Sequence, residues 1–217
     1  IMPRTSNLIA EGRMDEFRIL IQKSYDFVLA LAMPLTVGLI FTSPSIILLL
    51  SGEGFAPAVL TSQIVASNIL MVGLSGVMGI QVLYPLGKIN IVILCTLIGA
   101  AVNVFFNVLL IPRYGHNGTA VAYMLVEVAV TVSMFLIGRK YIPIQFLKKQ
   151  HLHYVGGGIV MGGVLYFISL LGLSIISTLI TMICVGIMVY IIVLLWLKDS
   201  IGMVILYIVW RKMKCRC

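Results

Sequence analysis

Polar side chains recur at helical spacing inside stretches that are otherwise apolar, and their types decide which chemistry they could perform. In residues 89–112, Cys95, Gly99, Asn103 and Asn107 follow one another at intervals of four. Residues four apart lie on the same face of an α-helix. Amides on one face of an apolar helix can bind a polar substrate or a cation, or they can hydrogen-bond to a neighbouring helix. This stripe therefore predicts either a polar pathway or a helix–helix contact.

Glu127 is the one charged residue in the apolar stretch 117–138, and it shares a helical face with Tyr123 and Thr131. A carboxylate at the centre of a membrane helix costs on the order of 3 kcal/mol. The apolar stretches contain no Lys or Arg that could pair with it. Two interpretations stay open. Glu127 is either a functional site for a proton, a cation or a substrate, or a protonated structural acid bonded to the amides of the preceding stretch.

A third polar stripe follows one face of residues 57–83, where Gln63, Ser67 and Ser75 align. Polar groups in hydrocarbon need a partner or a purpose, so the three stripes are expected to face one another or a wet cavity. For the amides, the alternative is hydrogen bonding between packed helices without any role in transport. The residues predicted to line a substrate or ion pathway are Asn68, Gln81, Asn103, Asn107, Tyr123 and Glu127.

Pro34 falls inside the first long apolar stretch, where a proline removes a backbone donor and bends the helix. Broken helices often line transporter sites, and tolerated kinks are also common, so both interpretations remain. The sequence shows no nucleophile–base pair, no metal-ligand spacing and no phosphate-binding loop. We therefore predict no enzyme activity, no catalytic residue, no metal and no cofactor. His151 and His153, beside basic residues, are expected to face lipid headgroups.

The composition defines the elements that must position these residues. Of the 217 residues, 61% are hydrophobic and 10% are charged, and the mean hydropathy is +1.14. Soluble domains are about half apolar and about a quarter charged, so soluble enzymes and secreted disulfide modules are excluded. An all-α, polytopic membrane helix bundle surrounded by membrane lipids is expected. The net charge of +8 comes from cations clustered between apolar runs, which indicates membrane topology and no nucleic-acid partner.

Six transmembrane helices are expected, because such a helix needs about 20 mostly apolar residues. The stretch between Lys149 and Lys198 carries no charge and would make a single helix roughly 70 Å long. It must therefore fold back, and Gly172-Leu173-Ser174 is the expected turn. The six expected helices cover residues 27–50, 57–83, 89–112, 117–138, 154–171 and 175–197.

Lysine and arginine are distributed unevenly between these runs. Of the 15 such residues, all but Arg113 fall in alternate segments. The positive-inside rule then places both termini in the cytoplasm. The expected organisation is a cytoplasmic amphipathic segment, a four-helix transmembrane bundle, a basic cytoplasmic connection, a terminal transmembrane helix pair and a basic cytoplasmic tail. These segments cover residues 1–26, 27–138, 139–153, 154–197 and 198–217.

One longer motif resembles a known family. Residues 103–127 read NVFFNVLLIPRYGHNGTAVAYMLVE. This run is similar to the "N…N..LIP.YG..GTA.A…E" signature of bacterial oligosaccharide flippases, the polysaccharide transporters that include the O-antigen-unit flippases of lipopolysaccharide biosynthesis. They belong to the superfamily shared with multidrug and toxin extrusion proteins. Shorter resemblances to the same family lie at residues 2–6, 52–58, 81–88 and 186–190.

The resemblance implies a flippase of the bacterial inner membrane with two helix bundles around a central cavity. Such a protein moves an undecaprenyl-pyrophosphate-linked oligosaccharide to the outer leaflet, driven by an ion gradient with a proton or sodium as coupling ion. The chain resembles only the C-terminal part, so a missing N-terminal bundle or a partner subunit would complete the cavity. Two alternatives stay open: a cation-coupled multidrug exporter of the same superfamily, and a non-transporting truncated membrane component.

Overall fold

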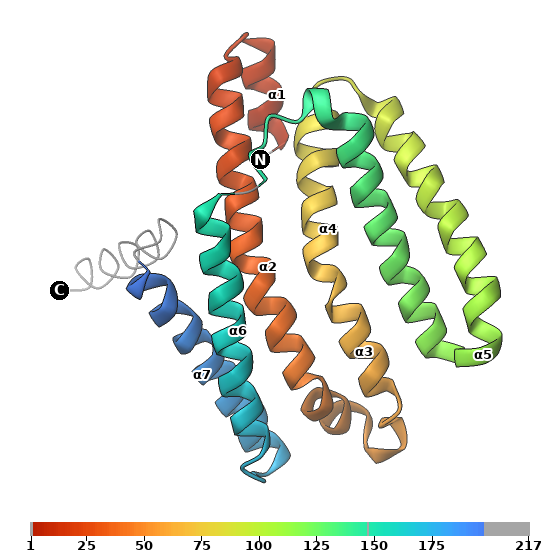
Figure 1. The fold of residues 1–217 in the computed structure, drawn as a ribbon, viewed down its shortest axis with the longest axis vertical. Coiled ribbons are helices and arrows are strands. Elements are labelled where there is room, and N and C mark those ends of the chain that lie inside the picture. The colour runs from red at the N-terminus through yellow and green to blue at the C-terminus, as the bar shows by residue number, and fades with distance from the viewer. Residues whose placement is uncertain (1, 147, 198–217) are drawn as a thin grey trace.

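The computed structural model describes residues 2–146 and 148–197, and every regular element in these ranges is a helix (Figure 1). Within these ranges, five helical segments are long and apolar enough to cross a membrane. The chain is therefore an all-helical, multi-pass membrane protein, as its composition predicts. The basic tail expected at 198–217 lies outside the described residues. The elements are α1 (Met2–Ala10), α2 (Met14–Ser51), η1 (Glu53–Phe55), α3 (Ala58–Ala66), α4 (Asn68–Gly76), η2 (Val77–Leu83), α5 (Ile89–Gly138), η3 (Arg139–Tyr141), α6 (Lys149–Ser169) and α7 (Ile175–Trp196).

The long helix α2 joins the amphipathic N-terminal turns to the first apolar run. It covers 38 residues and passes without a break through residue 26, where a segment boundary was expected. Phe17 and Ile21 belong to the apolar face of these turns, and both are fully buried in the core. Because this face packs against the protein, the helix continues beyond the apolar run at its polar end.

Two prolines inside α2 each leave a backbone carbonyl without its helical donor, and neighbouring helices supply replacements. Pro34 cannot donate to the carbonyl of Ala30, which accepts a hydrogen bond from Tyr190 Oη of α7 at 2.8 Å. The carbonyl four residues before Pro44 accepts a hydrogen bond from Gln63 Nε2 of α3 at 3.0 Å. The prolines therefore tie α2 to α7 and to α3.

The second apolar run is an interrupted rod made of α3, α4 and η2. The interruption is at Ser67, whose hydroxyl donates to the carbonyl of Ile64 at 2.6 Å. At the other end, η2 is a π-helix, and the amide of Tyr84 donates to the carbonyl of Gly79, five residues earlier, at 2.9 Å. Such π-turns are uncommon and widen a helix locally.

The third and fourth apolar runs together form α5, which turns back on itself (Figure 1). Gly115 has φ +53° and ψ −130°, a conformation that glycine adopts without a side-chain clash. At Gly118, a Cβ atom would lie 2.5 Å from the carbonyl oxygen of Leu110, so only glycine allows this close approach. We call residues 89–114 the first arm and residues 116–138 the second arm of α5. The arms run antiparallel.

The helices α6 and α7 form a second hairpin. Gly172, with φ +63°, lies in the connection between them, at the expected turn. Helix α7 begins at the expected residue, whereas α6 begins at Lys149, five residues before the expected start at 154. Gly157 of α6 allows close packing, because its Cβ would lie 3.0 Å from the ring of Tyr190.

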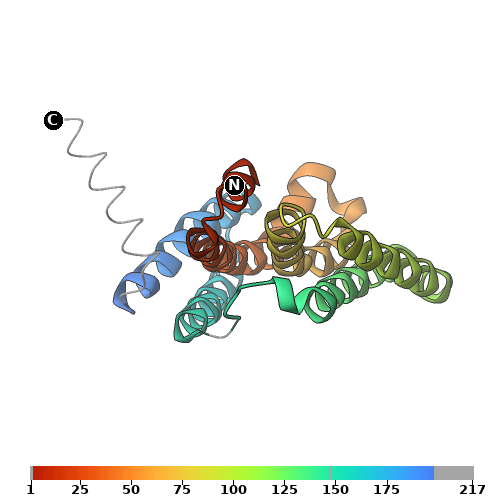
Figure 2. The ribbon, with the colours of Figure 1, turned by 90° about the horizontal axis from the view of Figure 1, so that it is seen from above.

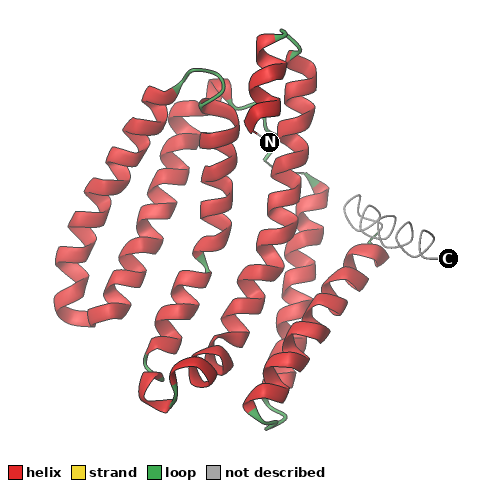
Figure 3. Ribbon diagram, turned by 180° about the vertical axis from the view of Figure 1, so that it is seen from behind, coloured by secondary structure: helices red, strands yellow, loops and turns green. Residues whose placement is uncertain are grey.

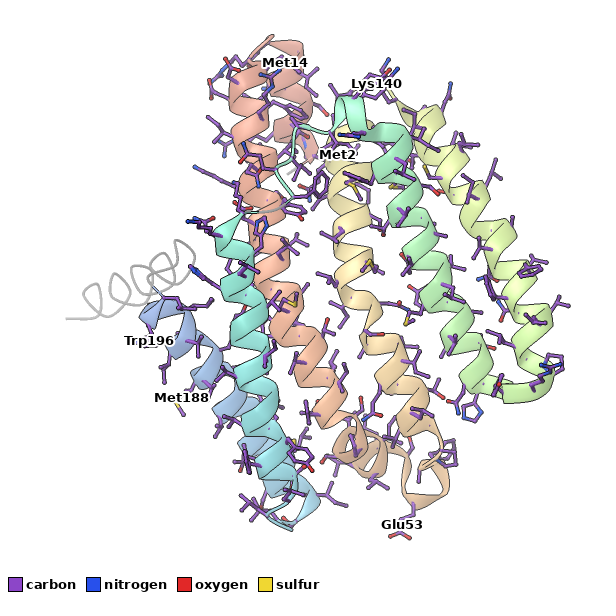
Figure 4. The ribbon with its side chains drawn as sticks, in the orientation of Figure 1. Met2, Met14, Glu53, Lys140, Met188 and Trp196 are labelled. Atoms are coloured by element: carbon purple, nitrogen blue, oxygen red, sulfur yellow. The ribbon has the colours of Figure 1, made fainter. Side chains whose placement is uncertain are left out.

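The helix α2 lies in the middle of the array. On one side it packs against α6 and α7, and on the other against α3 and α4, with α5 beyond them (Figure 2). The view from behind shows the same order of helices, joined by short loops (Figure 3). Met14 and Lys140 lie at one end of the array and Glu53 at the opposite end (Figure 4). Lys88 also lies at the first end, since its Nζ and that of Lys140 are 5.0 and 5.1 Å from the centre of the same Tyr141 ring.

Candidate functional site

An open cavity of about 650 Å³ lies between the α4–η2 rod and the two arms of α5. Asn103 of the first arm and Glu127 of the second arm both line it, together with Ser75 and Thr96. Most of the remaining wall consists of small or apolar side chains, and no Lys or Arg of the described ranges belongs to it. The structure therefore brings together two of the predicted pathway residues from opposite arms of one hairpin. We call this space the polar cavity.

Small residues create the polar cavity and its tight hairpin. A Cβ at Gly99 would lie 2.5 Å from the side chain of Val130 on the opposite arm, so glycine allows the arms to approach. Gly79 of η2 faces the side chain of Met134 in the same way, with a would-be Cβ contact of 3.3 Å. Thr131 joins the second arm to α4 by donating to the carbonyl of Met71 at 3.2 Å.

The two amides of the first arm are bonded to each other. Asn107 Nδ2 donates to Asn103 Oδ1 at 2.8 Å and to the Asn103 carbonyl at 2.9 Å. This pairing orients the Asn103 amide, so that its Nδ2 group is the donor left for a ligand. Asn107 Oδ1 is buried and has no hydrogen-bond partner among the described residues. Asn107 thus supports Asn103 from one turn away and does not line the cavity itself.

Tyr123 lies one helical turn from Glu127, and its phenol interacts with the Glu127 carboxylate. The Tyr123 side chain is 37% exposed and does not line the polar cavity. The interaction gives the carboxyl group a polar neighbour on its own helix. Glu127 therefore has a phenol neighbour on its own helix and also lines the open cavity.

Gln81 and Asn68 lie outside the cavity wall. Gln81 Oε1 accepts a hydrogen bond from Ser24 Oγ, which joins η2 to α2. Asn68 begins α4, is only 2% exposed, and neither its Oδ1 nor its Nδ2 has a hydrogen-bond partner in the described parts of the chain. Of the six predicted pathway residues, the structure places Asn103 and Glu127 in the cavity wall, with Asn107 bonded to the former and Tyr123 beside the latter. Gln81 and Asn68 lie elsewhere.

Pro34 lines a different space, an apolar groove of about 470 Å³ between α2, α6 and α7. Its walls include Gly38 of α2, Met161 of α6 and Ile187 of α7, and nearly all other lining residues are also apolar. Pro34 frees the Ala30 carbonyl, and the hydrogen bond from Tyr190 to that carbonyl joins α2 to α7 beside the groove. The sequence does not predict this groove, because its residues come from three distant segments and carry no polar signal.

The structure also contains polar contacts that the sequence does not predict. His151 is 8% exposed and lies 3.0 Å from Asp26 of α2, so the expectation that it faces lipid headgroups is wrong. Asn117, at the tip of the α5 hairpin, accepts a hydrogen bond from Thr61 of α3 at 2.6 Å. Both pairs join residues more than 50 positions apart, and no local pattern predicts such pairs.

Over residues 1–194, the chain matches the family model described as "Lipid II flippase MurJ". The chain belongs to the MurJ family of lipid II flippases. This family is a member of the exporter superfamily that the motif at residues 103–127 indicated, so the resemblance is confirmed at the level of the superfamily. MurJ-family membership agrees with the array of apolar helices seen here.

A curated relative is the uncharacterized membrane protein MJ1068 of Methanocaldococcus jannaschii. It is 25% identical to the chain over 150 residues, which are 69% of this chain and 29% of the relative. The alignment with this chain thus spans less than a third of the length of that relative.

Proposed function

We propose that this chain forms the C-terminal part of a flippase that carries a lipid-linked glycan across the membrane. The observation that carries the proposal is the shared polar cavity, into which Asn103 and Glu127 project from antiparallel arms of one hairpin. Amide and carboxyl groups donate to and accept from hydroxyl groups, which cover the surface of a sugar. Membership of a flippase family supports the same function.

The apolar groove on the opposite side of α2 suits the other half of such a substrate. Its walls, which include Pro34, Met161 and Ile187, offer almost no polar atoms to a ligand. A polyprenyl chain is pure hydrocarbon, so it fits this groove, whose wall presents no carboxyl group. A molecule with a sugar head and a polyprenyl tail requires both environments within one protein.

We further propose six membrane crossings with both termini in the cytoplasm. Each arm of α5 is long enough to cross a bilayer, and Gly115 turns the second arm back. The basic residues Lys88 and Lys140 lie together at the end of the array from which α2 starts, which favours that end as the cytoplasmic one. A location in the bacterial inner membrane follows from the proposed substrate.

For the substrate itself, we propose an undecaprenyl-pyrophosphate-linked oligosaccharide of surface polysaccharide biosynthesis, of the O-antigen-unit type. No Lys or Arg of the described ranges lines the polar cavity. We therefore assign recognition of the diphosphate to an N-terminal bundle or a partner subunit, which would face the open side of the cavity. The amides and Glu127 would then contact the sugars.

Glu127 is proposed to hold the coupling ion, either a proton or sodium, when the sugar is absent. A carboxyl group with a phenol neighbour and an open cavity can exchange an ion without crossing a barrier of packed side chains. Translocation breaks no covalent bond, so the proposal assigns no catalytic residue and no enzyme activity to the chain.

The test replaces Glu127 with Gln in the native gene and measures how much lipid-linked glycan reaches the outer face of membrane vesicles. We expect transport to fall about tenfold or more, because the variant keeps the shape but loses the ionisable group. The matched control is Glu53→Gln, which removes an exposed acid in the η1 turn at the far end of the array. Wild-type transport in a correctly inserted Glu127→Gln variant would refute the role of this residue.

The same assay separates the alternatives. A multidrug exporter would confer drug efflux and leave the lipid-linked glycan on the inner face. A non-transporting component would give no glycan translocation in either the wild type or the Glu127 variant. Either outcome would overturn the flippase proposal.

A further inference from the structure

A buried polar cluster joins the start of α6 to α2, outside the apolar runs at 27–50 and 154–171. His151 Nε2 lies 3.0 Å from Asp26 Oδ1, and Lys148 Nζ lies 3.4 Å from Asp26 Oδ2. The His151 side chain is 10% exposed and that of Asp26 is 14% exposed. Gln22 donates to the same Asp26 Oδ1 at 2.8 Å. The proposed transport function uses none of these residues.

The other ring nitrogen of His151, Nδ1, lies near one hydrogen-bond acceptor and one hydrogen-bond donor. Nδ1 lies 2.9 Å from the carbonyl oxygen of Phe146, which can only accept a hydrogen bond. Nδ1 also lies 3.2 Å from the backbone amide of Lys148, which can only donate one. A single nitrogen cannot serve both partners, because it either carries a proton or offers a lone pair.

The protonation state of His151 therefore selects one of two bonding patterns. In the neutral ring with its proton on Nε2, Nε2 donates to Asp26 and the Nδ1 lone pair accepts from the Lys148 amide. This second bond caps the N-terminus of α6, as the structure records. When a proton from water adds to Nδ1, the ring becomes an imidazolium. It then donates to Asp26 and to the Phe146 carbonyl, and the Lys148 amide loses its acceptor.

We propose that His151 is a proton-binding latch on the α5–α6 connection. Uptake of one proton moves the hydrogen bond of His151 Nδ1 from the Lys148 amide, at the start of α6, to the Phe146 carbonyl. In the neutral state, the latch strengthens the start of α6. In the protonated state, His151 holds the connection through its hydrogen bond to the Phe146 carbonyl. The latch therefore responds to the proton concentration around the start of α6.

The Phe146 carbonyl is well placed to transmit this change. It also accepts a hydrogen bond from Tyr25 Oη of α2 at 3.4 Å. The Phe146 ring packs edge-on against Tyr25 and Phe135, with ring centres 5.5 and 4.8 Å apart. Protonation of His151 thus adds a hydrogen bond from α6 to the carbonyl that already accepts from Tyr25 of α2. The connection leads from the arms that line the polar cavity to the helices that line the apolar groove.

Two residues of opposite charge lie close to the His151 ring. Asp26 of α2 contacts the ring, and Lys148 of the connection contacts the same carboxylate. Among the described residues, the phenols of Tyr25 of α2 and Tyr154 of α6 also face the ring. The charge around the His151 ring therefore comes from two residues that can be replaced separately.

The first experiment labels histidine and lysine with ¹⁵N in the complete chain in lipid nanodiscs and follows their nitrogens by NMR between pH 5 and 8. His151→Gln assigns the resonances. We expect Nδ1 of His151 to gain a proton in one transition, and the Lys148 amide to exchange about tenfold faster in the same transition after correction for intrinsic exchange. An Nδ1 that keeps one protonation state across this range would overturn the proposal. So would Lys148 protection that does not follow the transition.

The second experiment changes the two charges. We expect Asp26→Asn to lower the pH midpoint of the His151 transition by about one unit and Lys148→Gln to raise it. Lys149→Gln is the matched control, since it removes the same charge from an exposed neighbour and should shift the midpoint less. Equal shifts for both lysines, or an unchanged midpoint in Asp26→Asn, would refute the latch. The measurements need no transport, so they leave the flippase proposal to its own test.

Discussion

The polar cavity and the apolar groove lie on opposite sides of α2 and differ in how they are built. Both arms of α5 and the α4–η2 rod surround the cavity, whereas α2, α6 and α7 surround the groove. The cavity contains Glu127 and Asn103. The groove offers almost only hydrocarbon, and the hydroxyl groups of Tyr190 and Thr42 in its wall donate to backbone carbonyls.

This difference shows how one helical array can offer one ligand both an apolar and a polar binding environment. Hydrocarbon attracts no polar group, and a carboxyl group in hydrocarbon is costly, so the two environments must be kept apart. The central helix α2 separates them, and its prolines tie it to both sides. If this separation is important, a carboxylate placed in the groove and one placed in the cavity should have unequal effects on the stability of the protein.

The largest effect is expected when a carboxylate is placed in the groove. Ile187→Glu should lower the free energy of unfolding by about 3 kcal/mol, because the charge has no partner there. Thr96→Glu, in the polar cavity, should cost clearly less. Thermal unfolding of both variants in the same detergent checks the contrast, with Ile187→Leu as the control for shape. Equal costs would mean that the two spaces do not differ in polarity.

The next effect concerns the hairpin that creates the cavity. Gly118→Ala should lower the free energy of unfolding by about 2 kcal/mol, since its Cβ would meet the Leu110 carbonyl oxygen at 2.5 Å. Gly163→Ala in α6 meets no atom within 4 Å and should be neutral or stabilising through helix propensity. Chemical denaturation of the two variants measures the difference. A harmless Gly118→Ala would mean that the arms can separate freely.

A smaller effect is expected at the joint between α2 and α7. Tyr190→Phe removes the donor to the Ala30 carbonyl and should cost about 1 kcal/mol. Pro34→Ala restores a backbone donor to the same carbonyl, so the double variant Pro34→Ala/Tyr190→Phe should recover much of that loss. A double-mutant cycle of unfolding free energies tests this coupling. Strict additivity would show that Pro34 and Tyr190 act separately.

The smallest effect, of opposite sign, is expected at Asn68. Asn68→Leu replaces two buried polar atoms that lack partners in the described residues, so the free energy of unfolding should stay level or rise by up to about 1 kcal/mol. Asn103→Leu, which removes the acceptor of Asn107, should instead destabilise the protein. The unfolding midpoints of the Asn68→Leu and Asn103→Leu variants test this contrast. A marked loss in Asn68→Leu would show that its amide has a partner of its own.

Several features of the cavity were predictable because they depend on local spacing. Asn103 and Asn107 lie four residues apart, so any helix places them on one face, where the structure bonds them to each other. Gly115 and Gly118 follow a proline within a run of turn-forming residues, and the chain reverses there. The apolar groove and the Asp26–His151 pair were not predictable, since each depends on contacts between distant segments with no shared pattern.

The sequence by itself determined that the chain enters a membrane, where its apolar runs lie, and which polar residues share a helical face. Hydropathy and the helical period are local properties, and these predictions need no knowledge of neighbouring helices. Only the tertiary structure decided that Gln81 bonds to α2, that Asn68 is buried away from the cavity, and that His151 turns inward to Asp26. Those outcomes depend on how the rods rotate and approach one another, which the summed packing of the array sets.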